Sequence, residues 1–298
     1  MSRFHRGELA VQERAGVQAR AERVGGSIRR EIGPPAEAFL AERRWVVLAA
    51  ADDRGRPWAT VLTGPPGFAC ATGPRTVRLA AVPAPDDPLS PHLAAGGTAG
   101  LLAIDPPTRR RMRVNGTLEP GDGTLLLHAE QVYANCPRYI HPRDAGTGGA
   151  PRGSSRRGRA LSDAQRAWIR RADTFFIATV NPGEGADASH RGGPAGFVAV
   201  EGDRLVWPDY AGNMMYNTLG NIALHGRAGL LFLDFERGAR LMLTGTARIE
   251  WDPARARQVP DAERLVELDV EEVVEMGTEG GPSSAEPAPL PSEPTISP

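Results

Sequence analysis

Short apolar runs separated by turn residues dominate the pattern of the chain. The first run, Trp45–Ala49, ends at the turn sequence Asp52-Asp53-Arg54-Gly55, and similar runs follow at a spacing of roughly ten residues. This spacing favours antiparallel barrels over alternating βα units. The predicted strands are Trp45–Ala49, Trp58–Leu62, Thr76–Leu79, Ala99–Ile104, Met112–Val114, Leu125–Leu127, Thr174–Ala178, Gly196–Val200, Arg204–Trp207, Leu230–Leu233 and Leu241–Thr244. The fold class predicted is therefore mainly β with a few helices.

Helical patterns are few. They cover Gly7–Arg23, Pro35–Arg43, Ser162–Arg171 and Met214–Leu224. Pro34-Pro35 and Ser162-Asp163 are typical helix starts, because proline suits the first helical turn and a serine side chain caps free amides. No GxGxxG motif follows a predicted strand, which disfavours a dinucleotide-binding Rossmann unit.

The chain repeats itself once. GPPGF at 64–68 returns as GPAGF at 193–197, and the same 129 positions separate Gly100-Leu101-Leu102 from Gly229-Leu230-Leu231. Solenoid repeats are only about 20–50 residues long, so this period indicates a duplicated domain. The expected organisation is a helical segment at 1–40, a diverged first copy at 41–143, a linker at 144–160, a second copy at 161–276 and a disordered tail at 277–298.

Composition narrows the chemistry. All 35 basic residues are Arg, so a Walker lysine and a Schiff-base lysine are excluded. Two cysteines and six histidines, without a CxxC or HExxH motif, make a metal site unexpected. No long apolar segment is present, and the expectation is a reduced, cytoplasmic protein that does not bind a membrane.

One basic segment is the only feature that favours a nucleic-acid partner. Nine Arg lie between Arg138 and Arg171 against two Asp, although the whole chain has a net charge of only −1. A basic Gly/Ser-rich segment is more typical of a solvated linker, so no nucleic-acid partner is expected.

Three stretches carry candidate chemistry, and each has a plainer interpretation. ASHRGG at 188–193 places a hydroxyl and a guanidinium beside glycines, which suits a phosphate, but it also fits a polar hairpin turn. WPDYAGN at 207–213 precedes the helix pattern containing NTLGN at 217–221, where free amides favour an anion or form an ordinary cap. TRRRMRVNG at 108–116 is a basic wall or a solvated strand edge.

The order of these motifs resembles the pyridoxamine 5'-phosphate oxidase-like split-barrel family. The resemblance rests on ASHRGGPAGF, RLVWPDYAGN, NTLGNI, RAGLLFLDF and LTGTARI, and it covers roughly residues 165–255. The first copy resembles a diverged version through RPWATVLTGPPGF, DPLSPHLAAG, AGLLAI and RRRMRVNG. The resemblance implies tandem split β-barrels related by internal duplication.

The resemblance also implies FMN held between the two barrels of one chain, as in an intramolecular pseudo-dimer; a further homodimer stays open. Cys136, in NCPRY, is expected to pack or contact the flavin ring. The candidate cofactor-binding residues are Ser189, Arg191, Gly192, Asp209, Asn213, Asn217 and Thr218 from the second copy, and Arg109, Arg111, Asn135 and Arg138 from the first.

Two departures from the family pattern bear on the cofactor. Met214-Met215 stands where relatives often carry Arg, and the loop Ala81–Gly97 of the first copy has two Asp and no Arg, so no phosphate is expected there. The expected function is an FMN-dependent oxidoreductase acting on a small molecule, with its electron donor left open. The alternatives are a non-catalytic flavin or small-anion binding protein, and a deazaflavin-dependent reductase with FMN favoured over deazaflavin.

Overall fold

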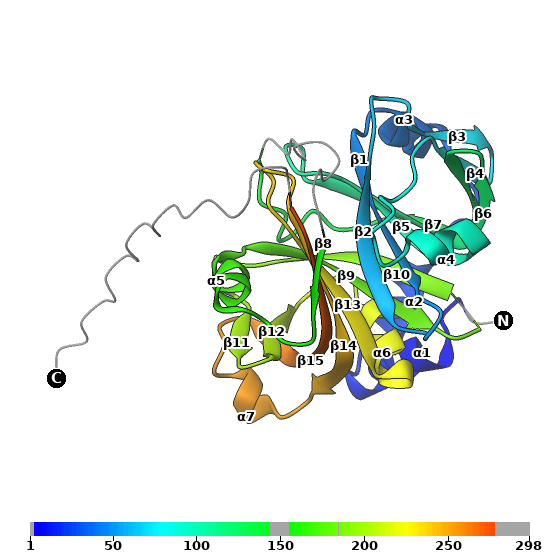
Figure 1. Ribbon diagram of the computed structural model, residues 1–298. Helices are drawn as coiled ribbons and strands as arrows, with labels where there is room; N and C mark the ends of the chain where they lie inside the picture. Colours follow the sequence, from blue (N-terminus) through cyan, green and yellow to red (C-terminus); the bar gives the residue numbers. More distant parts are fainter. Residues whose placement is uncertain (1–2, 144–154, 184, 278–298) are drawn as a thin grey trace.

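The structure, a computed structural model, describes residues 3–143, 155–183 and 185–277 and is mainly β (Figure 1). Its strands form two antiparallel sheets of seven and eight strands. The first sheet contains β1 (Trp45–Ala51), β2 (Pro57–Thr63), β3 (Ala69–Gly73), β4 (Thr76–Leu79), β5 (Gly97–Asp105), β6 (Arg110–Gly121) and β7 (Thr124–Ala134). The second contains β8 (Ser155–Gly158), β9 (Thr174–Asn181), β10 (Gly185–Gly192), β11 (Ala199–Glu201), β12 (Arg204–Tyr210), β13 (Arg227–Leu233), β14 (Arg240–Glu250) and β15 (Ala262–Met276).

The two sheets share one strand order. The first runs β2-β1-β5-β6-β7-β4-β3 and the second β10-β9-β13-β14-β15-β12-β11, with β8 added beside β15. Even an irregularity repeats, because the register between β6 and β7 shifts at Asn115/Gly116 and that between β14 and β15 shifts at Thr244/Gly245, 129 positions later. The predicted mainly-β fold class is thus confirmed.

Strands β1 and β9 lie where the two halves meet. Nearly every residue of β1 and every residue of β9 is buried, as expected for strands packed on both faces rather than for a sheet with one face in water. Across this junction the rings of Trp45 and Phe176 make an edge contact at 5.8 Å between centroids. The apolar core of the first half continues into residues of β9, β10, β13 and β14.

Two glycines allow the closest approach between the halves. A Cβ on Gly100 of β5 would lie 2.7 Å from the Ala188 nitrogen, and a Cβ on Gly229 of β13 would lie 2.2 Å from the Pro57 oxygen. The contact is reciprocal: β5 packs on the backbone of β10, and β13 packs on that of β2. Reciprocity of this kind characterises a two-fold, isologous association.

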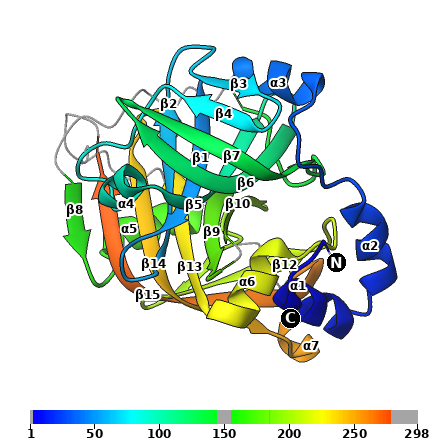
Figure 2. The ribbon, with the colours of Figure 1, turned by 90° about the vertical axis from the view of Figure 1, so that its right-hand side faces the viewer.

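Helices cover the ends of the sheets (Figures 1 and 2). They are α1 (Arg6–Arg14), α2 (Gln18–Gly25), α3 (Pro34–Ala41), α4 (Ser90–Ala95), α5 (Asp163–Arg171), α6 (Asn217–His225) and α7 (Pro253–Ala256). The single helix predicted over Gly7–Arg23 is two helices, because Gly16 adopts a φ of 68° between them. The helix predicted from Met214 begins only at Asn217, since Met214 and Tyr216 both have positive φ.

The boundaries of the predicted segments differ from the structure in one respect. The end of the predicted linker at 144–160 forms β8, whose Ser155–Gly158 backbone pairs with β15. The rest of the linker and the predicted disordered tail fall almost wholly on residues 144–154 and 278–298, outside the described residues. Of the helices in the described ranges, none is long and apolar enough to cross a membrane.

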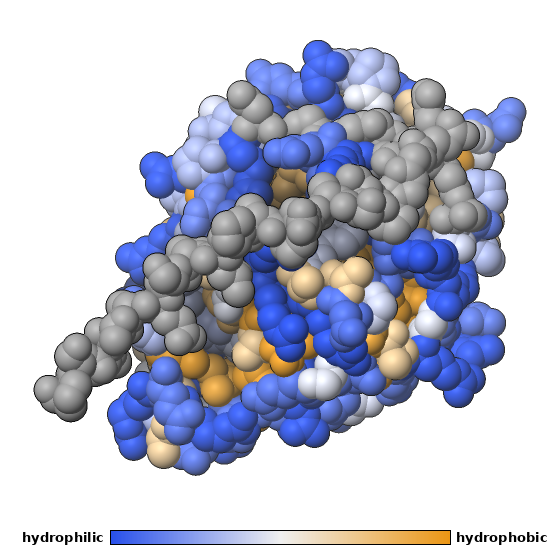
Figure 3. Space-filling model, turned by 60° about the vertical axis from the view of Figure 1, so that its left-hand side comes forward, coloured by the Kyte–Doolittle hydropathy of each residue, from blue (hydrophilic) through white to orange (hydrophobic). Residues whose placement is uncertain are grey.

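Hydrophilic side chains cover most of the face drawn in Figure 3, and hydrophobic ones are visible mainly in recesses between them. This distribution agrees with a core shared between the two halves rather than an exposed apolar face.

The glycine contact between the halves gives a stability prediction. Gly229→Ala is expected to cost about 1–3 kcal/mol, because the new methyl group meets the Pro57 backbone, which cannot rotate away. Thermal unfolding would show this as a Tm roughly 2–10 °C lower. Gly73→Ala is the matched control, since a Cβ there has no atom within 4 Å. Equal melting of both variants would refute the importance of this contact.

Candidate functional site

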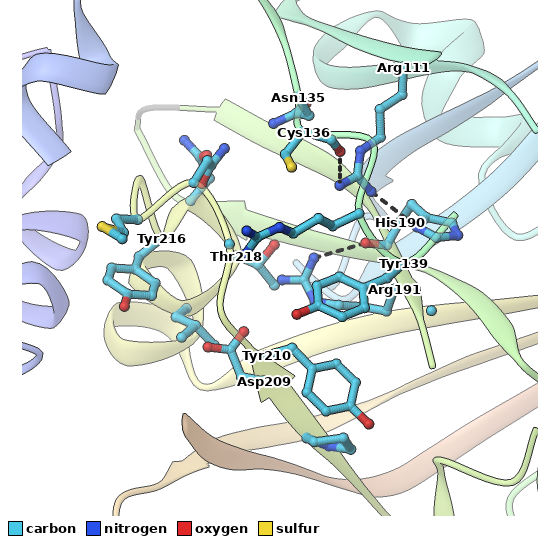
Figure 4. A pocket seen from close by; sticks show the side chains of 18 of the residues that line it. Arg111, Asn135, Cys136, Tyr139, His190, Arg191, Asp209, Tyr210, Tyr216 and Thr218 are labelled. Atoms are coloured by element: carbon cyan, nitrogen blue, oxygen red, sulfur yellow. Dashed lines mark hydrogen bonds between the residues drawn. The ribbon is translucent and has the colours of Figure 1, made fainter. Parts of the chain in front are cut away.

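A cleft opens between the two halves, beside the first turn of α6 (Figure 4). Its walls come from β6 and the segment after β7 in the first half, and from β10, β12 and the loop before α6 in the second. Most of the predicted site residues line it: Arg111, Asn135, Arg138, Arg191, Gly192, Asp209, Asn213, Asn217 and Thr218.

Two predicted residues are not among those that line the cleft. Arg109 lies exposed in the turn before β6, with a φ of 53°. Ser189 is completely buried behind the wall, where its hydroxyl donates to Asp187 at 2.9 Å and lies 2.9 Å from the Thr218 hydroxyl. The structure thus brings together predicted residues as far apart in sequence as Arg111 and Thr218, but it separates Arg109 and Ser189 from the cleft surface.

Sequence reasoning missed part of the wall. Arg113, His190 and three tyrosines, Tyr139, Tyr210 and Tyr216, also line the cleft. Period-two alternation was the available signal for Arg113, because residues 111 and 113 share one face of a strand. His190 lies within the ASHRGG motif, so its position next to Ser189 and Arg191 was the available signal, although it was not predicted as a site residue.

The ASHRGG segment is a strand and not the glycine-rich turn that was one of its interpretations. Residues 185–192 form β10, paired along their whole length with β9. The strand was missed because Asp187, Ser189 and His190 are polar, yet all three are buried. Their partners come from elsewhere in the fold, and burial of such groups is tolerated only when they are hydrogen-bonded.

Asp187 is the centre of that buried network. Its carboxylate forms an ion pair with Arg113 at 3.1 Å and accepts hydrogen bonds from Tyr133 at 3.3 Å and Ser189 at 2.9 Å. Burial opposes the charge on Arg113, but Asp187 outweighs it and the pKa of Arg113 is raised. Burial and the Asp187 charge also raise the pKa of Tyr133. The network ties β6 and β7 of the first half to β10 of the second.

Arg111 crosses from the first half to the second. One guanidinium nitrogen donates to the Cys136 carbonyl at 2.7 Å, and the other lies 3.1 Å from His190 Nδ1 (Figure 4). Burial, followed by the charges of Arg111 and Arg191, holds the pKa of His190 well below its usual value. The imidazole is therefore neutral, and because arginine only donates, Nδ1 accepts and the proton sits on Nε2.

The cleft carries an excess of positive charge. Arg111 and Arg191 form no ion pair with a carboxylate of the described residues, and Arg191 donates only to the His190 carbonyl at 3.1 Å. Burial, then the charges of Arg113 and Arg191, lowers the pKa of Arg111 to about 9. Burial also lowers the pKa of Arg191. The charge of Asp209 opposes this shift of Arg191 in part, but the ion pair of Asp209 is with Arg264 at 2.7 Å, and burial raises the pKa of Asp209.

The helix α6 presents its N-terminus to the cleft. Asn217, Thr218 and Leu219 line the cavity, and the N-cap residue Tyr216 makes no side-chain capping hydrogen bond. Free amides and the helix dipole make such an end favourable for an anion. The uncapped helix end and two guanidinium groups without an ion pair, those of Arg111 and Arg191, therefore lie in the walls of one cleft.

The N-terminal helix supports this arrangement from behind. The Glu8 carboxylate accepts a hydrogen bond from Asn217 at 2.6 Å, and Gln12 donates to the Met215 carbonyl at 3.1 Å. Gly7 and Gly220 let α1 and α6 approach, because a Cβ on Gly7 would lie 2.3 Å from the Gly220 oxygen. The N-terminal segment thus fixes the first turn of α6 and the loop before it.

Aromatic rings stand at the mouth of the cleft. Tyr139, from the segment after β7, stacks on Tyr210 of β12 with 5.0 Å between ring centroids. Tyr139, Met214 and Tyr216 all have φ near 60°, an unfavourable conformation for residues with side chains. Backbone strain of this kind concentrates at functional sites.

The described residues contain no group of three or more His, Cys, Asp or Glu side chains that could hold a metal ion. The chemistry that the cleft offers is thus recognition of an anion and stacking against a planar group, from Arg, helix amides and Tyr.

Comparison with known proteins agrees with the sequence pattern in the second half. Residues 161–277 match the family described as pyridoxamine 5'-phosphate oxidase. No curated protein matches the chain significantly.

Several solved structures resemble part of the chain. A putative pyridoxamine 5'-phosphate oxidase from Lactobacillus delbrueckii is 22% identical, with 38% of this chain and 93% of that one covered and a TM-score of 0.31. HupZ from Group A Streptococcus is 19% identical over 37% and 90%, with a TM-score of 0.30. HutZ, described as a heme storage protein from Vibrio cholerae, is 12% identical over 37% and 90%, with a TM-score of 0.29. The family match over residues 161–277, together with the antiparallel sheet that these residues form, gives the C-terminal half of the chain a split-barrel fold like that of the pyridoxamine 5'-phosphate oxidase family.

Proposed function

We propose that the cleft binds FMN and that the chain is an FMN-dependent oxidoreductase. The observation that carries the proposal is the meeting of Arg111 and Arg191, neither of which forms an ion pair with a carboxylate of the described residues, with the uncapped N-terminus of α6. Buried cations without a counter-charge are costly, and a phosphate group would compensate them.

The residues fit a phosphate-bearing planar ligand. Two buried polar atoms in the wall, Arg111 Nε and Asn135 Oδ1, have no hydrogen-bond partner among the described residues. Arg191 and the amides of α6 would hold the phosphate, while Tyr139 and Tyr210 would close the mouth against water. When bound, FMN supplies hydride transfer at its ring system. The neutral His190 keeps Arg111 oriented by accepting its hydrogen bond.

The proposal also treats the chain as an internal pair of split barrels that arose by duplication. The equal strand order, the repeated register shift and the reciprocal glycine contacts support this. A cofactor between two barrels then needs no second chain, because β6 of the first half supplies Arg111 and β10 of the second supplies Arg191. A homodimer is compatible with the proposal but is not required by it.

The direct test is reconstitution. Purified protein is incubated with FMN, separated from free ligand by gel filtration and examined by visible absorption, with riboflavin as the ligand that lacks the phosphate. Retained flavin absorption with FMN and much less with riboflavin is expected, because the cleft recognises the phosphate. Flat spectra with both ligands would refute FMN binding, and retention of a deazaflavin cofactor instead would favour a deazaflavin-dependent reductase.

Reduction of the bound flavin separates an enzyme from a binding protein. Anaerobic addition of NADH or NADPH is expected to bleach the flavin absorption at a rate that rises with the concentration of the reductant. A holoprotein that stays oxidised with both donors, and passes no electrons to added acceptors, would favour the non-catalytic flavin-binding alternative.

A substitution tests the proposed phosphate contact. Arg191→Met is expected to weaken FMN binding roughly 10- to 150-fold, because a hydrogen bond to a charged group contributes about 1.5–3 kcal/mol. Titration followed by flavin fluorescence measures the affinity. Arg109→Met is the matched control, since Arg109 lies exposed outside the cleft. Unchanged affinity of the Arg191 variant would remove this residue from the site.

A further inference from the structure

Two residues at and behind the cleft wall each have a counterpart in the other half of the chain. Thr60 of β2 holds the position that Ser189 holds in β10, and Arg240 of β14 holds that of Arg111 in β6. Each pair is 129 positions apart and occupies the same register against its neighbouring strand. Both arginines cross between the halves, but to neighbouring positions: Arg111 reaches His190, next to Ser189, whereas Arg240 reaches Thr60, the counterpart of Ser189, at 3.5 Å.

A carboxylate of the chain itself, that of Asp87, lies beside these counterparts, Thr60 and Arg240. Asp87 is 1% exposed and accepts hydrogen bonds from the Thr60 hydroxyl and, at 2.9 Å, from the Leu89 amide at the start of α4. Arg240, only 3% exposed, contacts the same Thr60 hydroxyl. The hydroxyl thus links a buried cation to a buried anion beside a helix N-terminus.

The position that corresponds to Asp87 has no carboxylate in the second half, where Ser189, the counterpart of Thr60, donates instead to Asp187 of its own strand. Counting 129 residues on, Asp87 corresponds to Tyr216 and Leu89 to Thr218. Tyr216 makes no side-chain capping hydrogen bond to α6, and its neighbours line the open cleft. The helix that follows Asp87 in the first half thus begins beside a buried carboxylate, whereas the corresponding helix α6 in the second half begins at an open cleft lined by arginines.

The loop that carries Asp87 is restrained. Pro83, Pro85 and Pro88 fix three backbone φ angles around it. The Asp86 carbonyl accepts a hydrogen bond from Arg157 at 3.1 Å, which ties the loop to β8 of the other half. A carboxylate held in this way is a permanent part of the structure.

We propose that the first of two equivalent sites is closed, because Leu62 stands where the second half has Arg191 and Asp87 serves as a built-in counter-anion for Arg240, so that each chain binds one phosphate-bearing cofactor. The number of cofactors rests on the proposed function, whereas the role of Asp87 as the counter-anion of Arg240 does not. Electrostatics agree with the second point: burial is the largest influence on both groups, raising the pKa of Asp87 and lowering that of Arg240 to about 10, and each charge opposes the shift of the other.

Chemical rescue tests the role of Asp87 without any flavin. Asp87→Ala is expected to lower Tm by about 4 °C or more, since it leaves Arg240 buried without its anion. Sodium formate, a small carboxylate, should restore at least half of that loss, whereas sodium chloride at equal ionic strength and neutral formamide should not. Asp86→Ala is the matched control, because Asp86 is the exposed carboxylate next to it. Equal responses of the two variants to formate would overturn the proposal.

A double-mutant cycle covers the case in which Asp87→Ala does not fold. Asp87→Asn keeps the volume of the side chain and removes only its charge. The Tm loss that it causes should fall by at least half in an Arg240→Met background, because the cation that needs the carboxylate is then absent. Equal losses in both backgrounds would show that Asp87 does not act as the counter-anion.

Counting bound cofactors completes the test. Titration of the intact chain with FMN is expected to saturate at one flavin per chain, and saturation at two would overturn the closure of the first site. Saturation at zero would refute the proposed function, while formate rescue and the double-mutant cycle would still decide the role of Asp87.

Discussion

The close contact of the two halves at Gly100 and Gly229 is the constraint on which the remaining structure depends. Each glycine lets a central strand of one sheet lie directly on the backbone of a strand from the other. With any side chain at these positions the sheets would separate, and the guanidinium groups that cross between them would no longer reach their partners. Arg111 reaches His190, and Arg240 reaches Thr60, only because this distance is short.

Crossing arginines create an electrostatic problem that the two halves solve differently. A buried guanidinium group requires compensation, since removing it from water costs several kcal/mol. In the first half Asp87 lies beside Thr60 and opposes the charge of Arg240. In the second half Asp187 compensates Arg113, but Arg111 and Arg191 keep their charge without a carboxylate partner among the described residues. The remaining positive charge is what makes this half suited to an external anion.

The N-terminal segment adds to the asymmetry. Its helix α1 packs on α6, and Glu8 binds Asn217 in the first turn of that helix. A helix end that no side chain caps would tend to fray, so a support from behind keeps its amides in place for a ligand. The open half is thus stabilised by contacts outside the cleft, whereas the closed half is stabilised by a group inside it.

Much of the fold could be predicted from the sequence, because most strands are apolar runs bounded by turn residues. The strand β10 could not, since the partners of its polar residues come from distant positions: Asp187 binds Arg113, and Ser189 contacts Thr218. For the same reason the sequence could not indicate that Ser189, predicted to lie beside the cofactor, is completely buried behind the cleft wall. The repeat of 129 residues pointed to two equivalent halves, but the sequence alone did not indicate that Arg240 corresponds to Arg111 and that Asp87 stands beside it.

The side chains of the cleft limit what its own residues can do. His190 is neutral and committed to Arg111, and Asp209 is committed to Arg264. The pKa values of Tyr139 and Tyr210 are raised, with burial as the largest cause, so both phenols stay protonated at neutral pH. Cations and neutral phenols bind and orient an anionic, planar molecule well, but they are poor proton acceptors. An activity located here would therefore draw its reactivity from the bound molecule, with the protein setting its position and its exposure to water.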